Sequence, residues 1–196
     1  MTNLDFITPN LATGGALPAN RAEAVRVLAE WRALGITHVV DNRFEWSDED
    51  LVAEHCPEIH YLHNGVDDAG QQMPDWWFDL GTEWVRGALQ DPEAKVLVHC
   101  HMGINRGPSM AYACLLVQGY DPVEAMTRVR TARPIAAIGY AEDALDWHHR
   151  THPVSRRRQV DERQRLAGWR DQNWIDVVRI IRGIRGIRGI RAAGAA

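Results

Sequence analysis

The stretch VLVHCHMGINRGPS, from Val96 to Ser109, places a short apolar run directly before a cysteine, a glycine-containing turn and an arginine. Three consecutive apolar residues at its start are typical of a strand that is covered on both faces of a sheet. An apolar segment follows from about Arg106 to Gln118 and stops at Gly119, which predicts a helix. The order of strand, short loop and helix therefore places Cys100 beside a helix start, at the carboxyl end of a buried strand.

The same alternation of strands and helices runs through most of the chain. Apolar spacing and terminal residues predict helices over 17–35, 47–57, 73–92, 121–133 and 140–150, and strands over 36–41, 58–63 and 94–100. In the helix over 73–92 we expect Trp77, Leu80 and Trp84 to form the buried stripe. This order predicts an α/β fold, with a largely parallel twisted sheet flanked by helices. In such sheets the ligand site lies beyond the carboxyl ends of the strands.

Composition is that of a globular protein. The 196 residues are 45% hydrophobic and 24% charged, and no apolar run approaches the roughly 20 residues that a membrane span needs. The first ten residues lack the basic and then apolar pattern of a signal peptide. Three scattered cysteines are too few for a disulfide framework, so we expect reduced thiols and a cytoplasmic location.

Charge is distributed unevenly along the chain. Residues 1–150 hold 11 Lys and Arg against 22 Asp and Glu, whereas residues 151–196 hold 11 Arg against 4 acids. We therefore expect two parts, a body of residues 1–152 and a basic C-terminal extension of residues 153–196. The extension is predicted to be partly helical and, in the repeat IRGIRGIRGIR, weakly ordered, because each repeat unit contains a glycine. Its arginines would contact the acidic body, a polyanion or an anionic membrane surface, or contribute little.

Residues 100–106, which we call the anion-binding loop, carry the chemistry. Backbone N–H groups of a loop that enters a helix can point at an anion, and the helix dipole adds positive potential there. Gly103 permits a tight turn, and the planar guanidinium of Arg106 can hold two phosphate oxygens. The same field favours the thiolate form of Cys100, which would then be a nucleophile directed at phosphorus.

This run resembles the HCxxGxxR signature of the cysteine-dependent protein tyrosine phosphatases, and His99, Cys100, Gly103 and Arg106 occupy its fixed positions. The resemblance covers about residues 5–150 and is closest to the compact dual-specificity branch, so residues 1–152 would be a phosphatase-like catalytic domain. It implies that Cys100 attacks phosphorus, that His99 orders the loop by hydrogen bonding, and that no metal or cofactor takes part. The residues implied to bind the phosphoryl oxygens are His101, Met102, Gly103, Ile104, Asn105 and Arg106.

The reaction needs a proton for the leaving oxygen. In this branch the acid is an aspartate on a loop about thirty residues before the cysteine. Asp68 lies at that place in the segment HNGVDDAGQQMPD, and its neighbour Asp67 is the alternative. We favour Asp68 on spacing.

The sequence departs from the family directly after the signature arginine. Most members carry Ser or Thr there, and its hydroxyl helps the cysteine sulfur leave when the phosphoenzyme is hydrolysed; here the residue is Gly107. We expect a slower second step with catalysis retained, and we expect Ser109, two residues later, to point elsewhere. A phosphate-binding pseudophosphatase remains the alternative.

The loop also bears on the substrate. It contains no lysine, which disfavours phosphoinositides, while its GxNR portion is similar to that of RNA 5′-triphosphatases, enzymes that usually lack the acid. The expected substrate is a protein carrying phosphotyrosine, with phosphoserine and phosphothreonine as further candidates and no obligatory nucleic acid.

Overall fold

The computed structural model describes residues 3–184 of the chain. In chain order its elements are β1 (Leu4–Phe6), β2 (Leu11–Gly14), α1 (Arg21–Ala33), β3 (His38–Arg43), α2 (Glu49–His55), β4 (His60–Val66), α3 (Asp75–Ala88), β5 (Val96–His99), α4 (Arg106–Val117), α5 (Pro122–Ala132), α6 (Ala141–Thr151) and α7 (Arg156–Gln172). A further helical segment covers 177–184.

The strands form one sheet in the order β1-β2-β5-β3-β4. Strand β1 pairs with β2 antiparallel, and the other three pairs are parallel. Strand β5 lies at the centre, with Val96 in register with Leu11 on one side and His38 on the other. The predicted α/β fold with a largely parallel sheet is confirmed, and the loop after β5 leaves from the middle of the sheet.

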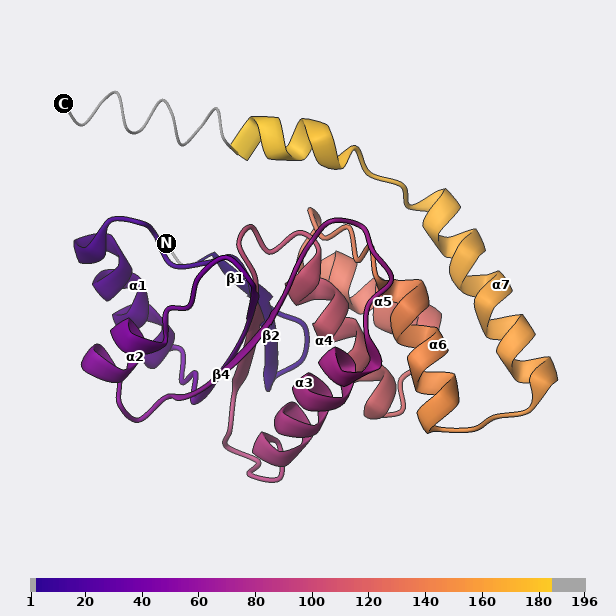
Figure 1. Cartoon of the computed structure of the whole chain (residues 1–196), viewed down its shortest axis with the longest axis horizontal. Coiled ribbons are helices and arrows are strands. Elements are labelled where there is room, and N and C mark those ends of the chain that lie inside the picture. The colour runs from indigo at the N-terminus through magenta and orange to yellow at the C-terminus, as the bar shows by residue number, and fades with distance from the viewer. Residues whose placement is uncertain (1–2, 185–196) are drawn as a thin grey trace.

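Alternation along the strands divides the core between two faces of the sheet (Figure 1). Val96 and Val98 pack into the cluster formed with α3, α4, α5 and α6, whereas Leu97 packs into the cluster formed with α1 and α2. Because both faces are covered, consecutive positions of the central strand are buried, and Val96, Leu97 and Val98 are apolar without alternation. The continuous apolar run before Cys100 is therefore explained by helices on both sides.

Helix α4, which begins at the end of the anion-binding loop, is buried all round. Every residue from Arg106 to Leu116 is buried, and neighbouring elements are β2, β5, α3, α5 and α6. A helix that is apolar on all sides belongs in an interior. Its first turn is thereby fixed relative to the end of β5.

The buried face of α3 differs from the predicted stripe. Trp77 and Phe78 are both fully buried, whereas Leu80 is 46% exposed and Trp84 is only partly buried. The Trp77 Nε1 donates to Asn42 Oδ1 and to the Asn64 carbonyl, both at 3.1 Å. The middle of the buried face lies between the adjacent side chains of Trp77 and Phe78, so position 80 faces the solvent. The prediction that Leu80 is buried was wrong.

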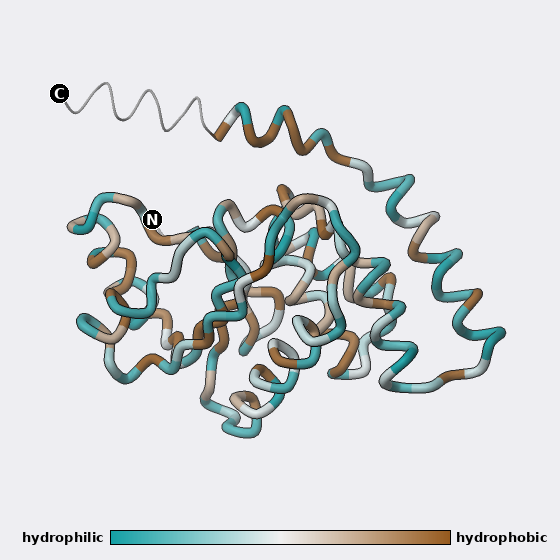
Figure 2. Tube along the Cα trace, viewed as in Figure 1, coloured by the Kyte–Doolittle hydropathy of each residue, from teal (hydrophilic) through white to brown (hydrophobic). Residues whose placement is uncertain are grey.

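Helix α7 packs outside α5 and α6 and is strongly hydrophilic (Figures 1 and 2). Its Leu166 is buried, and Glu162 is buried against His149 of α6 with 2.6 Å between Oε2 and Nε2. Three of its arginines form ion pairs with carboxylates of the body; the pairs are Arg163 with Asp146, Arg165 with Asp121, and Arg170 with Glu142. These contacts correspond to the predicted contact between the basic extension and the acidic body.

Most of the IRG repeat, from residue 185 onward, lies outside the described residues, and so does the prediction that it is weakly ordered. Within residues 3–184, no helix combines the length and apolar character needed to cross a membrane.

Two substitutions in α3 test the position of its buried face. Phe78→Ala should lower the free energy of unfolding by about 3–5 kcal/mol, because it removes a fully buried ring from the core. Leu80→Ala should change the free energy of unfolding by less than about 1 kcal/mol, because the Leu80 side chain is half-exposed and leucine and alanine both favour helix. Urea denaturation of the two variants measures the difference, and similar losses for both would contradict the observed face.

Candidate active site

The site lies where the loops after β3, β4 and β5 meet, at the carboxyl edge of the parallel strands. Strand β5 supplies His99 and Cys100, the loop after β3 supplies Glu45, and the loop after β4 supplies Asp68. Cys100 is only 3% exposed, and its backbone N–H donates to the Gly14 carbonyl at 3.3 Å. The predicted cysteine, arginine and aspartate are therefore brought together.

Carbonyl groups of His99 and of the anion-binding loop accept hydrogen bonds from surrounding parts of the protein. The carbonyl of His99 accepts from Asn42 Nδ2 at 3.0 Å, and that of His101 accepts from the Ala16 N–H at 3.1 Å. The Ile104 carbonyl accepts from the Ala137 N–H at 2.7 Å. Because these carbonyl groups bind the surrounding protein, the N–H groups of the loop are left on its opposite face.

Arg133, in the turn after α5, braces the same loop. Its Nε donates to the Gly103 carbonyl and its Nη2 to the Met102 carbonyl at 3.0 Å. The other edge of the guanidinium reaches Asp5 Oδ2 at 2.7 Å and Asn3 Oδ1 at 2.8 Å. One buried side chain thus ties the loop to the N-terminal segment.

The N–H groups of residues 102–106 in the loop are available to a ligand. Within residues 3–184, the N–H groups of residues 102–106 donate to no protein acceptor. They precede the twelve-residue helix α4, whose N-terminus adds positive potential. This arrangement is the physical requirement for an anion cradle.

The guanidinium of Arg106 is held from one side. Glu45 accepts from both terminal nitrogens, Nη1 at 2.9 Å and Nη2 at 2.8 Å, and Nη1 also donates to the Val66 carbonyl at 2.9 Å. Burial is the largest single effect and lowers the pKa of Arg106, but the hydrogen bonds with Glu45 and the negative charges of Cys100, Asp68 and Glu45 together outweigh it and raise that pKa. The Arg106 hydrogen bonds also lower the pKa of Glu45 to about 2, so this carboxylate stays charged at neutral pH.

The remaining donor of Arg106 has no protein acceptor. Its Nε is buried without a hydrogen-bond partner in the described chain and lies 3.5 Å from Asp68 Oδ2. Glu45 therefore leaves the Nε side of the guanidinium for a bound oxyanion.

Asp68 is fixed by two donors on one oxygen. Its Oδ1 accepts from Asn105 Nδ2 and from the Tyr140 hydroxyl, both at 2.7 Å. The Tyr140 pKa is raised, by burial and then by the hydrogen bond with Asp68, so the hydroxyl keeps its proton. Asp67 instead accepts from the Asp68 backbone N–H at 2.7 Å. Of the two candidates, Asp68 directs its second oxygen toward Arg106.

His99 directly precedes the anion-binding loop. The ring is fully buried, and within the described residues neither ring nitrogen forms a hydrogen bond; Nε2 lies 3.8 Å from Asp41 Oδ1. Burial is the main cause that lowers the pKa of His99, which favours a neutral ring. Its ring packs against Trp31, with 5.8 Å between centroids. The backbone of Cys100 acts on the ring in the opposite direction and raises its pKa, so His99 adjoins the start of the anion-binding loop, and its role in ordering that loop stays a prediction.

Gly107 allows α4 to approach the end of β5 closely. A Cβ at this position would lie 3.1 Å from His99 Cα and 3.1 Å from the Val98 carbonyl oxygen. Ser109 does point elsewhere, as expected, because its Oγ accepts from the Tyr140 backbone N–H at 3.2 Å.

Comparisons with known proteins agree with this geometry. Residues 20–142 match the family model described as the catalytic domain of dual specificity phosphatases. The chain belongs to the dual specificity phosphatase family. Dual specificity protein phosphatase 13B of Homo sapiens is 29% identical over 142 residues, which are 69% of this chain and 67% of that protein. Dual specificity protein phosphatase 26 of Mus musculus is 30% identical over 135 residues, 67% of this chain and 60% of that protein.

A solved structure shows the same fold. The crystal structure of human DUSP28 superimposes with a TM-score of 0.60 at 17% identity, covering 77% of this chain and 96% of that one. The identity is low, so this likeness establishes the dual specificity phosphatase fold and nothing finer.

Three residues that support this site, Glu45, Arg133 and Tyr140, were not identified from the sequence. Glu45 follows a parallel strand next to β5, so its position at the carboxyl edge was a usable signal. Arg133 lies 30 residues after Gly103 and Tyr140 lies 72 residues after Asp68, and nothing local to them indicates which carbonyl or carboxylate they reach.

Substitution of Gly103 tests the phosphatase loop. Gly103 has φ +65° and its Cβ would lie 2.5 Å from the Gly14 carbonyl carbon, whereas Gly119 has φ +88° with open space around it. Gly119→Ala should cost about 1–2 kcal/mol of stability from the positive φ alone. Gly103→Ala should in addition weaken binding of inorganic phosphate or vanadate by at least about tenfold, because the backbone must shift. Calorimetric titration of both variants measures this, and equal affinities would contradict the crowding.

Proposed function

We propose that this chain hydrolyses phosphotyrosine in proteins, and in second place phosphoserine or phosphothreonine, through a phosphocysteine intermediate. Membership of the family supports protein phosphatase activity. The observation that carries the finer proposal is a set of donors with no hydrogen-bond acceptor in the described chain, the N–H groups of residues 102–106 and Arg106 Nε, which follow Cys100 and adjoin Asp68. Donors fixed before the substrate arrives stabilise charge that develops on the phosphoryl oxygens.

In the first step the Cys100 thiolate attacks phosphorus, and an S–P bond forms as the P–O bond to the tyrosine oxygen breaks. Asp68 delivers its proton to that leaving oxygen. Asn105 and Tyr140 hold Oδ1 of Asp68, so we assign the proton to Oδ2, the oxygen nearer Arg106. General acid catalysis of this kind contributes about 10²–10⁴-fold to a rate.

In the second step a water molecule attacks phosphorus and gives a proton to the Asp68 carboxylate. The S–P bond breaks, inorganic phosphate leaves, and the Cys100 thiolate and protonated Asp68 are restored. The electron pair of the breaking bond returns to sulfur. Gly107 offers no hydroxyl to the sulfur, and Ser109 is hydrogen-bonded to Tyr140, so we expect this step to limit turnover.

The rim of the site supports an aromatic substrate. Phe44 and Trp46 flank Glu45 and are 69% and 44% exposed. The Trp46 ring meets His101 of the anion-binding loop edge to face, with 5.0 Å between centroids. An exposed aromatic wall next to the loop suits the ring of phosphotyrosine.

Hydrolysis of aryl phosphates in a buffer with a metal chelator tests the proposal. Cys100→Ser should abolish turnover, because the nucleophile is lost. Asp68→Asn should lower kcat/KM, which reports the first step, by about 10²-fold on phenyl phosphate and by much less on p-nitrophenyl phosphate, whose leaving group needs less proton donation. Asp67→Asn is the matched control and should leave both rates near those of the unaltered enzyme.

Three outcomes would overturn the assignment. Turnover retained in Cys100→Ser would exclude the phosphocysteine route. A leaving-group dependence that appears in Asp67→Asn and not in Asp68→Asn would move the acid to Asp67. Phosphopeptide binding without any hydrolysis would identify a phosphate-binding pseudophosphatase.

The role of Gly107 gives a separate kinetic prediction. The unaltered enzyme should release a burst of aryl alcohol before a slower steady rate, because the second step is limiting. Gly107→Ser and Gly107→Ala introduce the same Cβ, 3.1 Å from the His99 backbone, and only the first adds a hydroxyl. Stopped-flow measurement should therefore show a steady rate at least severalfold higher for Ser than for Ala; equal rates, or no burst in the unaltered enzyme, would contradict the prediction.

A further inference from the structure

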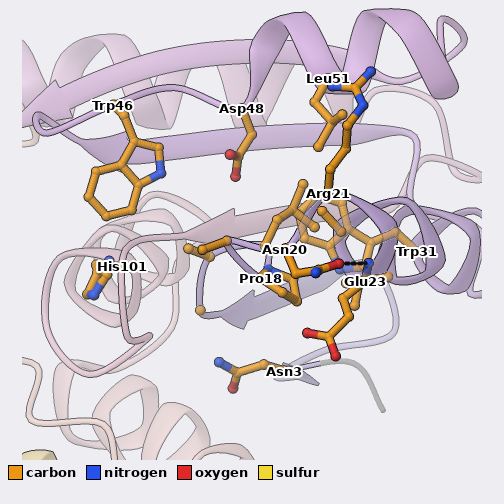
Figure 3. Close-up of a pocket in the computed structure, with 16 residues that line it drawn as sticks. Asn3, Pro18, Asn20, Arg21, Glu23, Trp31, Trp46, Asp48, Leu51 and His101 are labelled. Atoms are coloured by element: carbon orange, nitrogen blue, oxygen red, sulfur yellow. Dashed lines mark hydrogen bonds between the residues drawn. The ribbon is translucent and has the colours of Figure 1, made fainter. Parts of the chain in front are cut away.

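A groove of about 1000 Å³ lies beside the anion-binding loop (Figure 3). Its walls come from the loop between β2 and α1, from α1, from the loop after β3 and from the start of α2. Apolar side chains supply much of this surface, and those used below are Leu17, Val27, Trp46 and Leu51. The groove is large enough for several amino-acid side chains.

The groove is continuous with the site described above. His101, which directly follows Cys100, belongs to the anion-binding loop and also lines the groove. Trp46 lines the groove as well and contacts the His101 ring edge to face. In Figure 3 these two side chains stand at one end of the groove, and Leu51 and Arg21 stand toward the other. A group bound in the groove would therefore lie close to a phosphoryl group on Cys100.

Charged side chains in the lining are already paired within the protein. Arg21 pairs with Glu54 at 2.6 Å, and Asp48 accepts from Arg43 at 2.6 Å. The third charged residue of the described lining, Glu23, pairs with Arg26 at 3.7 Å. Ionic groups on a ligand would compete with these pairs, whereas apolar groups would not.

The surroundings favour a peptide over an anionic lipid surface. Glu45, Asp67 and Asp68 lie around the anion-binding loop, while Glu23 and Asp48 line the groove. Arg21 is the one arginine in the described lining, which contains no lysine, and it is paired with Glu54, so the groove offers no unpaired Lys or Arg to anionic lipid headgroups. A peptide can carry one phosphorylated residue with neutral apolar neighbours.

We propose that this groove is a specificity subsite that binds a large apolar side chain of the substrate peptide near the phosphorylated residue. The proposal rests on the proposed function, because it places the phosphorylated residue on Cys100. Because His101 directly follows Cys100 and also lines the groove, an extended peptide places the apolar residue near the phosphotyrosine in its own sequence. Burial of a leucine-sized side chain accounts for a preference of about tenfold or more.

The test compares phosphotyrosine peptides that differ only by leucine or serine at one position near the phosphotyrosine. At one such position the leucine peptide should show a kcat/KM at least about tenfold higher than the serine peptide. Dissociation constants for the Cys100→Ser protein give the same comparison without turnover. Each enzyme is judged by the ratio between its two peptides, so a general loss of activity or folding cancels.

Variants in the groove and a matched control outside it test whether the leucine preference arises in the groove. Val27→Gln on α1 and Leu51→Gln on α2, made separately, should reduce the leucine-to-serine ratio toward one. Leu80→Gln replaces a half-exposed leucine on α3, outside the groove, and should keep the ratio.

Equal kcat/KM values for the leucine and serine peptides at every position would overturn the subsite and leave the proposed function intact. A leucine preference in binding with no hydrolysis would support the subsite and overturn the proposed function. Binding to phosphoinositide vesicles that the Val27 and Leu51 variants weaken, with no peptide preference, would overturn the proposal in favour of a lipid.

Discussion

A loop that turns its N–H groups toward an anion must satisfy its carbonyl groups elsewhere, and this constraint organises the molecule. Arg133 binds the carbonyls of Met102 and Gly103, and backbone N–H groups from two other segments bind those of His101 and Ile104. An unpaired buried carbonyl would cost about 1–3 kcal/mol. The N-terminal segment, the turn after α5 and the loop after β2 converge on this one loop because each supplies part of this requirement.

The site also balances opposing charges around one buried arginine. Glu45 binds the two terminal nitrogens of Arg106, and Asp68 adjoins its Nε. Glu45 keeps the Arg106 guanidinium in one orientation, but its negative charge also weakens the attraction of that guanidinium for a dianion. The loop N–H groups and the start of α4 then supply the rest of the attraction, which explains why the helix begins inside the site.

The sequence was sufficient for the α/β fold and for the placement of the central strand, because periodicity and turn residues are local properties. It also predicted Cys100, Arg106 and Asp68 as neighbours in one site, since a loop signature and a chain separation specify them. It could not identify the partners that fix these groups. Arg133, Tyr140 and Glu45 act on residues 30 to 72 positions away, and only the packing of α5, α6 and β3 brings them there. Likewise Leu80 could not be distinguished from Phe78 until the aromatic contacts of α3 were known.

The attachment of α7 has a consequence for solution conditions. The helix is held by the buried Leu166 and the partly buried Trp169, by the buried contact between Glu162 and His149, and by ion pairs whose side chains are partly solvent-accessible. Exposed pairs are screened when ionic strength rises, whereas the anion-binding loop is braced by a buried guanidinium. Added salt should therefore loosen the extension before it disturbs the anion-binding loop, so the two parts of the chain differ in their sensitivity to the ionic medium.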